Sequence, residues 1–132
     1  MARLMAVSLT EDAVRDRTKT VTRRLGWTFL KPGDRLQLCR KVMGRKHADG
    51  TVEPLERIAL VEVVSVRRER LDSLFLDSQS DYAACAREVA REGFPGKSPE
   101  WFVRFFREHM HCTPDTVVTR IEWRYLEEGT DA

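Results

Sequence analysis

Residues 15–24 read R-D-R-T-K-T-V-T-R-R. This stretch, the basic segment, holds five basic side chains and three threonines beside one acid, Asp16. Burying unpaired cations is costly, so the segment is not expected inside a core. Apolar residues that follow it, Leu25, Trp27 and Phe29, anchor it to a folded body. We interpret it as an anion or nucleotide site; a solvated basic strand or loop is the alternative.

Length and composition are typical of one globular domain. The chain has 132 residues, of which 42% are hydrophobic and 33% charged. We expect one domain over residues 1–126 and a frayed tail over 127–132. No apolar run approaches the roughly 20 residues that span a membrane, and because the N-terminal residues include no long apolar stretch, we expect no signal peptide. Three cysteines form no disulfide framework, which predicts a cytoplasmic, reducing location.

Charge is divided unevenly along the chain. Residues 15–46 carry a net charge of +9, the rest carries −7, and the whole carries +2. Localised positive charge of this size is typical of a face that binds a polyanion. The acidic remainder would limit nonspecific binding.

Local patterns predict short strands in the first half of the chain. Apolar or alternating stretches bounded by turn residues favour strands over residues 4–8, 19–25, 35–43 and 57–67. The motif Ser8-Leu9-Thr10-Glu11 fits a capping box that opens a helix to about residue 17. Turns are predicted at 31–34 (K-P-G-D) and at Asp49-Gly50.

Two helices and a strand are predicted in the second half. Ser80 or Asp81 caps a helix that Gly93 ends, and Ser98-Pro99 begins another. An aromatic stripe on this second helix is expected in the core: Trp101, Phe102, Phe105 and Phe106. The last strand, residues 116–126, is predicted to direct alternate residues to one face: Val117, Ile121, Trp123 and Tyr125. Together these elements predict an α+β fold, a small mixed or antiparallel β-barrel with peripheral helices.

Two motifs carry a resemblance to a known family. The sequence K-T-x-T-R-R at 19–24, followed by G-D-x-L at 33–36, resembles the ASCH domain family of the PUA-like superfamily. The short single-domain form is similar to its bacterial and bacteriophage members. The resemblance implies a barrel whose cleft binds RNA or a nucleotide-like ligand. One departure is Arg17, because the family usually has glycine two residues before the motif's lysine.

One bacterial branch of that family hydrolyses the amide of N4-acetylcytidine. The resemblance implies that Lys19, Thr22 and Glu92 form the catalytic group here. Thr22 would be the nucleophile, neutral Lys19 its base, and Glu92 a proton carrier or orienting group. Nearby cations favour a neutral Lys19 by lowering its pKa: Arg17, Arg23 and Arg24. Lys19 and Thr22 are three residues apart, so sharing one site requires a turn or bulge between them.

Further side chains are candidate ligand or nucleic-acid contacts: Arg17, Thr20, Arg23, Arg24, Trp27, Arg67 and Arg68. No cofactor or metal is expected, because the spacing of His109, His111 and Cys112 matches no standard zinc pattern. Three functions stay open: binding of RNA or a modified nucleotide, hydrolysis of an N4-acylated cytidine, and sequestration of a host protein. The oligomeric state is not predicted.

Overall fold

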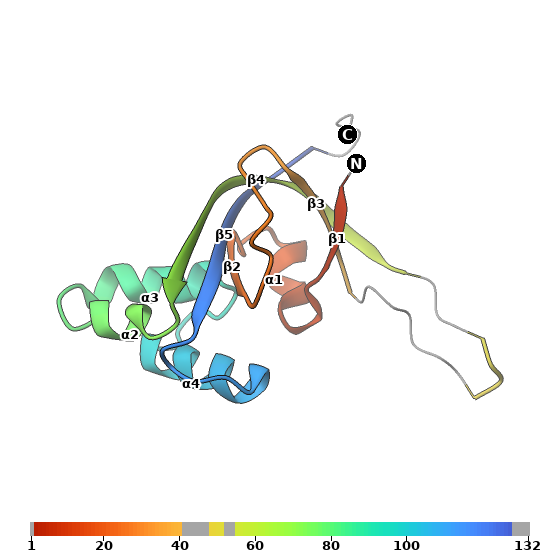
Figure 1. The fold of residues 1–132 in the computed structure, drawn as a ribbon. Coiled ribbons are helices and arrows are strands. Elements are labelled where there is room, and N and C mark those ends of the chain that lie inside the picture. The colour runs from red at the N-terminus through yellow and green to blue at the C-terminus, as the bar shows by residue number, and fades with distance from the viewer. Residues whose placement is uncertain (1, 41–47, 52–54, 128–132) are drawn as a thin grey trace.

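A five-stranded mixed sheet forms the body of the protein (Figure 1). A computed structural model describes residues 2–40, 48–51 and 55–127. The strand order is β1-β3-β4-β5-β2; only the β1–β3 pair is parallel. The strands are β1 (Arg3–Ala6), β2 (Val21–Arg24), β3 (Arg35–Cys39), β4 (Arg57–Arg70) and β5 (Val117–Tyr125).

The sheet curls into a half-barrel along its longest strand. The first part of β4 pairs with β3, and most of its length pairs with β5. The register with β5 shifts between Val63 and Ser65, and such a bulge bends a strand and increases its twist. Strands β1 and β2 are the two edges, and the Arg24 guanidinium joins them by donating from NH2 to the Ala6 carbonyl at 2.8 Å. The predicted α+β class is confirmed.

Helices occupy two connections: the one from β1 to β2, which are opposite edges of the sheet, and the one from β4 to β5, which are neighbouring strands. The turn η1 (Ser8–Thr10) and helix α1 (Glu11–Arg15) lie between β1 and β2, on the concave side of the curl. Helices α2 (Ser73–Asp77), α3 (Tyr82–Arg91) and α4 (Pro99–Met110) connect β4 to β5 and gather at one end of the sheet (Figure 1). None of the described helices has the length and apolar character needed to cross a membrane.

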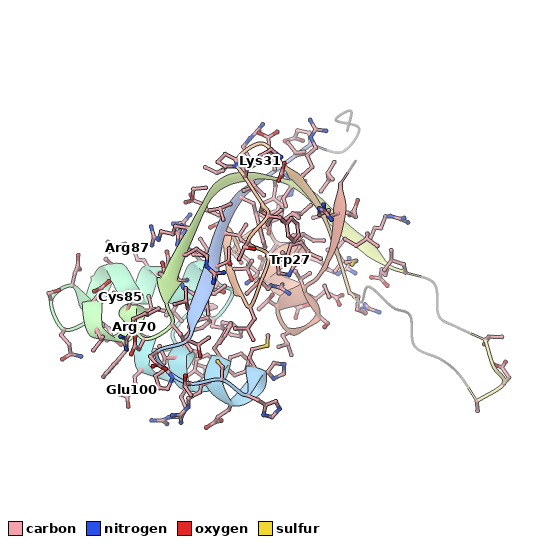
Figure 2. The ribbon with its side chains drawn as sticks, viewed as in Figure 1. Trp27, Lys31, Arg70, Cys85, Arg87 and Glu100 are labelled. Atoms are coloured by element: carbon pink, nitrogen blue, oxygen red, sulfur yellow. The ribbon has the colours of Figure 1, made fainter. Side chains whose placement is uncertain are left out.

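Apolar side chains form two separate clusters. The first lines the curl of the sheet and includes Met5, Leu36, Val61 and Trp123; Trp27 packs against it (Figure 2). The second lies under the helices and includes Leu71, Val89, Phe102, Phe106 and Val118. The space where the two clusters meet is therefore bordered by both the sheet edges and the helices.

Helix caps bear out part of the local prediction. Asp81 accepts a hydrogen bond from the Ala84 amide at 3.1 Å, and Ser98 accepts one from Trp101 at 3.0 Å. The capping box predicted at Ser8 is wrong, because residues 8–10 form a 3-10 turn. Neither the residue that precedes this turn nor the N-cap of α1 makes a capping hydrogen bond with its side chain. Helix α2 was not predicted, since it spans only five residues.

The ends of the strands also differ from the prediction, as does the face of β5 on which Val117 lies. Strand β4 continues to Arg70, and β3 ends at Cys39; the rest of the predicted strand over 41–43 lies outside the described residues, as does the tail beyond residue 127. Val117 is 46% exposed, whereas Val118 is fully buried in the second cluster. The helices cover the β5 face opposite the one predicted to be apolar, so alternation alone misassigned this end of the strand.

Gly93 allows α3 to end against α1. Its φ is +105°, and an added Cβ would lie 2.9 Å from Thr10 Cγ2 and 3.3 Å from Ala13 Cβ. We expect Gly93→Ala to lower the free energy of unfolding by about 2–3 kcal/mol, combining backbone strain with overpacking. Urea denaturation measures this. Gly96→Ala is the control: its φ is +83° with no heavy atom within 4 Å, so only the strain, about 1 kcal/mol, is expected. An equal loss of unfolding free energy in the two variants would show that the close contact with Thr10 does not contribute.

Candidate functional site

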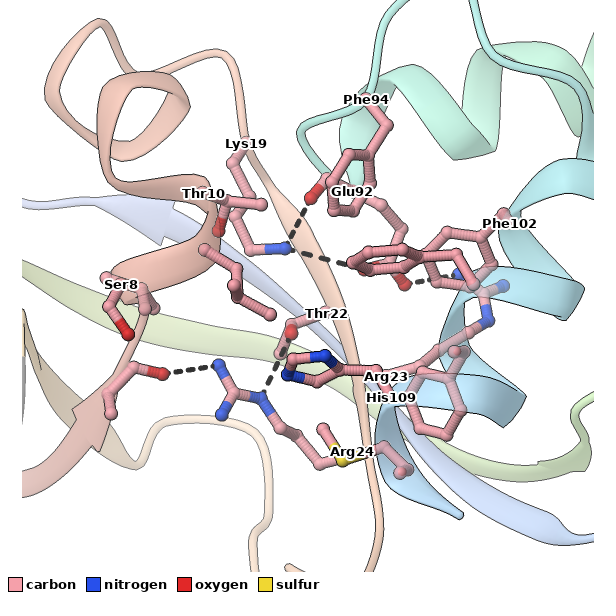
Figure 3. Close-up of a pocket in the computed structure, with 16 residues that line it drawn as sticks. Ser8, Thr10, Lys19, Thr22, Arg23, Arg24, Glu92, Phe94, Phe102 and His109 are labelled. Carbon is pink, nitrogen blue, oxygen red and sulfur yellow. Dashed lines mark hydrogen bonds and ion pairs between the residues drawn. The ribbon is translucent and has the colours of Figure 1, made fainter. Parts of the chain in front are cut away.

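A cavity of about 270 Å³ opens between the sheet edges and helix α4 (Figure 3). One side is polar and comes from the basic segment and the end of α3: Lys19, Thr22, Arg23, Arg24 and Glu92. The other side is mainly aromatic and comes from α4 and the residues before it: Phe94, Phe102, Phe105, Phe106 and His109. The three residues that the resemblance implied as catalytic therefore line one pocket.

Lys19 lies just before β2, which begins at Val21. Its carbonyl oxygen accepts hydrogen bonds from Trp123 Nε1 at 3.1 Å and from the Tyr125 hydroxyl at 2.5 Å. Its own amide donates to Ala13 at 3.1 Å, not to a strand neighbour. This irregular backbone lets Lys19 and Thr22 reach the same cavity despite their spacing, as the catalytic hypothesis requires.

Arg17 makes the turn that leads into Lys19. Its φ is +64°, in the left-handed region that glycine adopts without steric cost. Arg17 thus adopts a backbone conformation that favours glycine, at the position where the resemblance led us to expect a glycine. Its guanidinium lies 5.6 Å from the centre of the Tyr125 ring and does not line the pocket.

Lys19 is 2% exposed, and its side chain contacts Glu92 twice. Its Nζ donates to the Glu92 carbonyl oxygen at 2.5 Å and to Glu92 Oε1 at 3.4 Å (Figure 3). The pKa of Lys19 is lowered to about 8, chiefly by burial; Arg24 and Arg23 also lower it, and Glu92 opposes them. The predicted direction is confirmed, but burial rather than the neighbouring arginines is the main cause.

The lowered pKa makes stability depend on alkaline pH. Between pH 8 and the ordinary lysine pKa of 10.5, the unfolded chain holds a proton on Lys19 that the folded chain has released, so stability rises with pH. Relative to Lys19→Met, the wild type should gain about 3 kcal/mol of unfolding free energy over this interval. Urea denaturation of both proteins at pH 7.5 and 10.5 measures this gain. Cysteine and tyrosine side chains also titrate over this interval, but they do so in both proteins, and their effect cancels when the two are compared. Lys97 is exposed, so the wild type should gain no unfolding free energy relative to Lys97→Met over the same pH interval. The prediction would be contradicted if the stabilities of Lys19→Met and Lys97→Met changed with pH in the same way.

Glu92 is 2% exposed and caps the end of α3. Its Oε2 accepts a hydrogen bond from Arg23 NH1 at 2.8 Å. Arg23 also donates to Glu88 at 2.7 Å and to Glu69 at 3.2 Å. Burial by itself would lower the pKa of Arg23, but the three carboxylates have the larger effect, so its pKa is raised. Arg23 lines the pocket, but its donors are engaged by protein carboxylates.

Arg24 differs from Arg23 in having only neutral partners. It donates from Nε to Thr22 Oγ1 at 3.2 Å and from NH2 to the Ala6 carbonyl (Figure 3). No carboxylate of the described chain lies within the 4.0 Å of an ion pair. Burial lowers the pKa of Arg24, with Glu92 opposing. A guanidinium so placed favours a ligand oxygen that carries negative charge.

The other predicted contact residues lie outside the pocket. Thr20 Oγ1 accepts from Arg91 at 2.9 Å, and Trp27 lies against the first apolar cluster. Arg67 pairs with Glu69 at 2.8 Å, and Arg68 donates to Thr119 at 2.7 Å. Ion pairs with acidic residues also hold arginines elsewhere on the described chain: Arg15, Arg40, Arg70, Arg91, Arg120 and Arg124. Much of the predicted polyanion face is thereby neutralised.

Sequence reasoning missed the aromatic side of the pocket. Phe105 and Trp101 were expected in the core but are half-buried, with parallel rings 4.9 Å apart. His109 stacks on Phe105 at 5.7 Å, and both line the cavity. The i, i+4, i+8 spacing on α4 signalled a common face, but not that this face borders a cavity. The described residues contain no group of three potential metal ligands.

Solved structures share this fold. The ASCH domain from Lactobacillus crispatus JV V101 is 14% identical with a TM-score of 0.55, over 94% of this chain and 79% of that one. The hypothetical protein PH0355 is 19% identical with a TM-score of 0.58, over 96% and 100%. Protein EF3133 from Enterococcus faecalis V583 is 12% identical with a TM-score of 0.56, over 96% and 80%. No family model matches the chain, and no curated protein is significantly similar to it. The chain therefore has an ASCH-like fold.

Proposed function

We propose that the protein hydrolyses the amide of an N-acylated nucleobase, with N4-acetylcytidine as the test substrate. One observation carries the proposal: Lys19, Thr22 and Glu92, drawn from segments up to 73 residues apart, line one cavity and Lys19 contacts Glu92. The ASCH-like fold supports it, because the amidohydrolase branch that the sequence motif resembles shares that fold.

The cavity walls suit a planar heterocycle that carries a polar substituent. Flat rings on one side offer stacking surfaces, including Phe105 and His109. Hydroxyl, ammonium and carboxylate groups lie on the other side. A volume of about 270 Å³ favours a single nucleoside-sized ligand over a stretch of polynucleotide.

Acylation of Thr22 is the first step of the proposed mechanism. With a pKa of about 8, roughly a tenth of Lys19 is neutral at pH 7 and available as a base. The Thr22 oxygen attacks the amide carbonyl carbon while its proton passes to Lys19. The Arg24 guanidinium, which already donates to Thr22, stabilises the negative oxygen of the tetrahedral intermediate. The ammonium of Lys19 then protonates the leaving amine as the C–N bond breaks.

Deacylation restores the site. A water molecule attacks the Thr22 ester, Lys19 takes the water proton, and the carboxylic acid leaves as Thr22 regains its hydrogen. Throughout, Glu92 accepts from the Lys19 ammonium and so stabilises its protonated form. Each residue thus has the role that the chemistry of amide hydrolysis predicts for it.

A second candidate function is binding of a nucleotide without turnover. The neutral partners of Arg24 favour it, since they leave the guanidinium able to pair with an anionic ligand group. Long RNA is less favoured, because several arginines outside the pocket are paired with carboxylates.

Incubation of the purified protein with N4-acetylcytidine tests the proposal. We expect cytidine and acetate in equal amounts, detected by liquid chromatography. Tight binding by calorimetry without cytidine release would replace hydrolysis with the binding function. Strongly salt-dependent binding of single-stranded RNA would instead restore the polyanion hypothesis. Absence of all three results, together with a captured protein partner, would favour sequestration.

A further inference from the structure

A buried group of ion pairs includes Glu92. We call it the arginine–carboxylate cluster; it consists of Arg23, Glu69, Glu88, Glu92 and Arg120. Arg23 comes from β2, Glu69 from β4, Arg120 from β5, and the other two from α3 and its C-cap. The cluster therefore joins three strands of the sheet to the helix that presents Glu92.

Geometry divides the two oxygens of Glu92 between two cations. Oε2 accepts from Arg23 NH1 at 2.8 Å, and Oε1 faces Lys19 Nζ at 3.4 Å. A guanidinium is a rigid planar donor, so a carboxylate bound to it has a defined orientation. The side chain of Arg23 is 1% exposed and has no room to swing into water.

Glu88 in turn holds Arg23 in place. Its Oε2 accepts from Arg23 NH2 at 2.7 Å and from Arg120 Nε at 2.5 Å, and its Oε1 accepts from Arg120 NH2 at 3.2 Å. Burial alone would raise the pKa of Glu88, but Arg120 and Arg23 lower it to about 2, so it stays charged. The Arg23 guanidinium is thus fixed from both sides, by Glu88 and by Glu92.

We propose that Arg23, held by Glu88, is a positioning residue that orients the Glu92 carboxylate toward Lys19. This inference rests on the proposed function, in which the Lys19–Glu92 contact governs proton transfer. It assigns the first arginine of the motif's R-R pair, Arg23, to the interior of the protein and not to ligand contact.

The proposal predicts opposite effects on Lys19 from two neighbouring substitutions. The charged groups that face Lys19 are Glu92, Arg24 and Arg23, and those that face Arg23 are the rest of the cluster. Removing the Arg23 charge by Arg23→Gln should raise the pKa of Lys19. Removing the Glu88 charge by Glu88→Gln leaves Arg23 less neutralised, which should lower the pKa of Lys19. General loosening of the fold would move both values in one direction.

Nuclear magnetic resonance of 13C-labelled lysine side chains tests these shifts without any turnover. The chain has five lysines, and loss of one signal in Lys19→Met assigns Lys19. With N4-acetylcytidine, Glu88→Gln should lower kcat about tenfold or more while KM stays within twofold, because misorientation acts on the chemical step. Glu62→Gln is the matched control: Glu62 is a β4 glutamate that pairs with surface Arg124 at 3.2 Å, and neither readout should change.

The outcomes separate the inference from the proposed function. Opposite shifts of Lys19 without cytidine release in the wild type would support the charge coupling and overturn the hydrolase. Cytidine release with unchanged kcat and an unchanged Lys19 titration in Glu88→Gln would overturn the positioning role and retain the hydrolase. If Arg23→Gln fails to fold, Glu88→Gln alone decides, through the lowered pKa of Lys19 and the fall in kcat.

Discussion

Thr22→Ala is expected to lower kcat for N4-acetylcytidine by at least about 10³-fold. The substitution removes the oxygen that would form the acyl-enzyme, and loss of a nucleophile costs most of the rate enhancement. Ligand binding should persist within a few-fold, because the aromatic side of the pocket is untouched. Steady-state release of cytidine at saturating substrate measures kcat, and calorimetry measures binding of the acylated nucleoside.

Two further variants make the result specific to the hydroxyl. Thr22→Ser keeps an oxygen at the same position and should retain measurable turnover. Thr20→Val removes a hydroxyl two residues away that bonds to Arg91 outside the pocket, and turnover should stay within about threefold of wild type, a change well below 1 kcal/mol in activation free energy. Turnover of Thr22→Ala within tenfold of wild type would exclude a covalent intermediate on Thr22. A water molecule activated by Lys19 would then be the attacking group.

Arg23→Gln is expected to lower the free energy of unfolding by about 3–5 kcal/mol at pH 7. The substitution leaves three carboxylates facing each other with one cation fewer, and an uncompensated buried charge is strongly destabilising. Chemical denaturation monitored by tryptophan fluorescence measures the loss. Arg67→Gln removes another partner of Glu69, but this arginine is 62% exposed, so a loss below about 1 kcal/mol is expected.

The loss should shrink in acid. The pKa of Glu88 is lowered from its ordinary value of 4.5 to about 2, by Arg120 and by Arg23. A carboxylate with a lowered pKa contributes stability above its unfolded value, and this contribution disappears as pH falls toward the folded value. The difference between wild type and Arg23→Gln should therefore be full above about pH 5 and decrease between pH 4.5 and 2. A constant difference over this range would mean that Arg23 stabilises the fold by packing and not by charge.

Short-range patterns in the sequence were enough to predict much of the fold. Asp81 and Ser98 act as caps because their hydrogen bonds reach only three residues along the chain. Alternating or apolar stretches likewise located the strands of the sheet, and the lysine motif with its glycine–aspartate turn indicated the ASCH-like fold. The predicted irregular backbone at Lys19 followed from a spacing of three residues. All of these depend on neighbours that the sequence itself places side by side.

The charge state of the site depended on distant neighbours. Arg23 and Arg67 have the same side chain and both lie on strands, yet one is buried among three carboxylates and the other is exposed. The Lys19–Glu92 contact joins residues 73 apart, and the curl of the sheet and the end of α3 create it. Phe105 and His109 face a cavity for the same reason. The sequence determined which groups exist and which local elements carry them. Burial and pairing of those groups are properties of the packed chain, because the energy of a charge depends on whatever surrounds it in space.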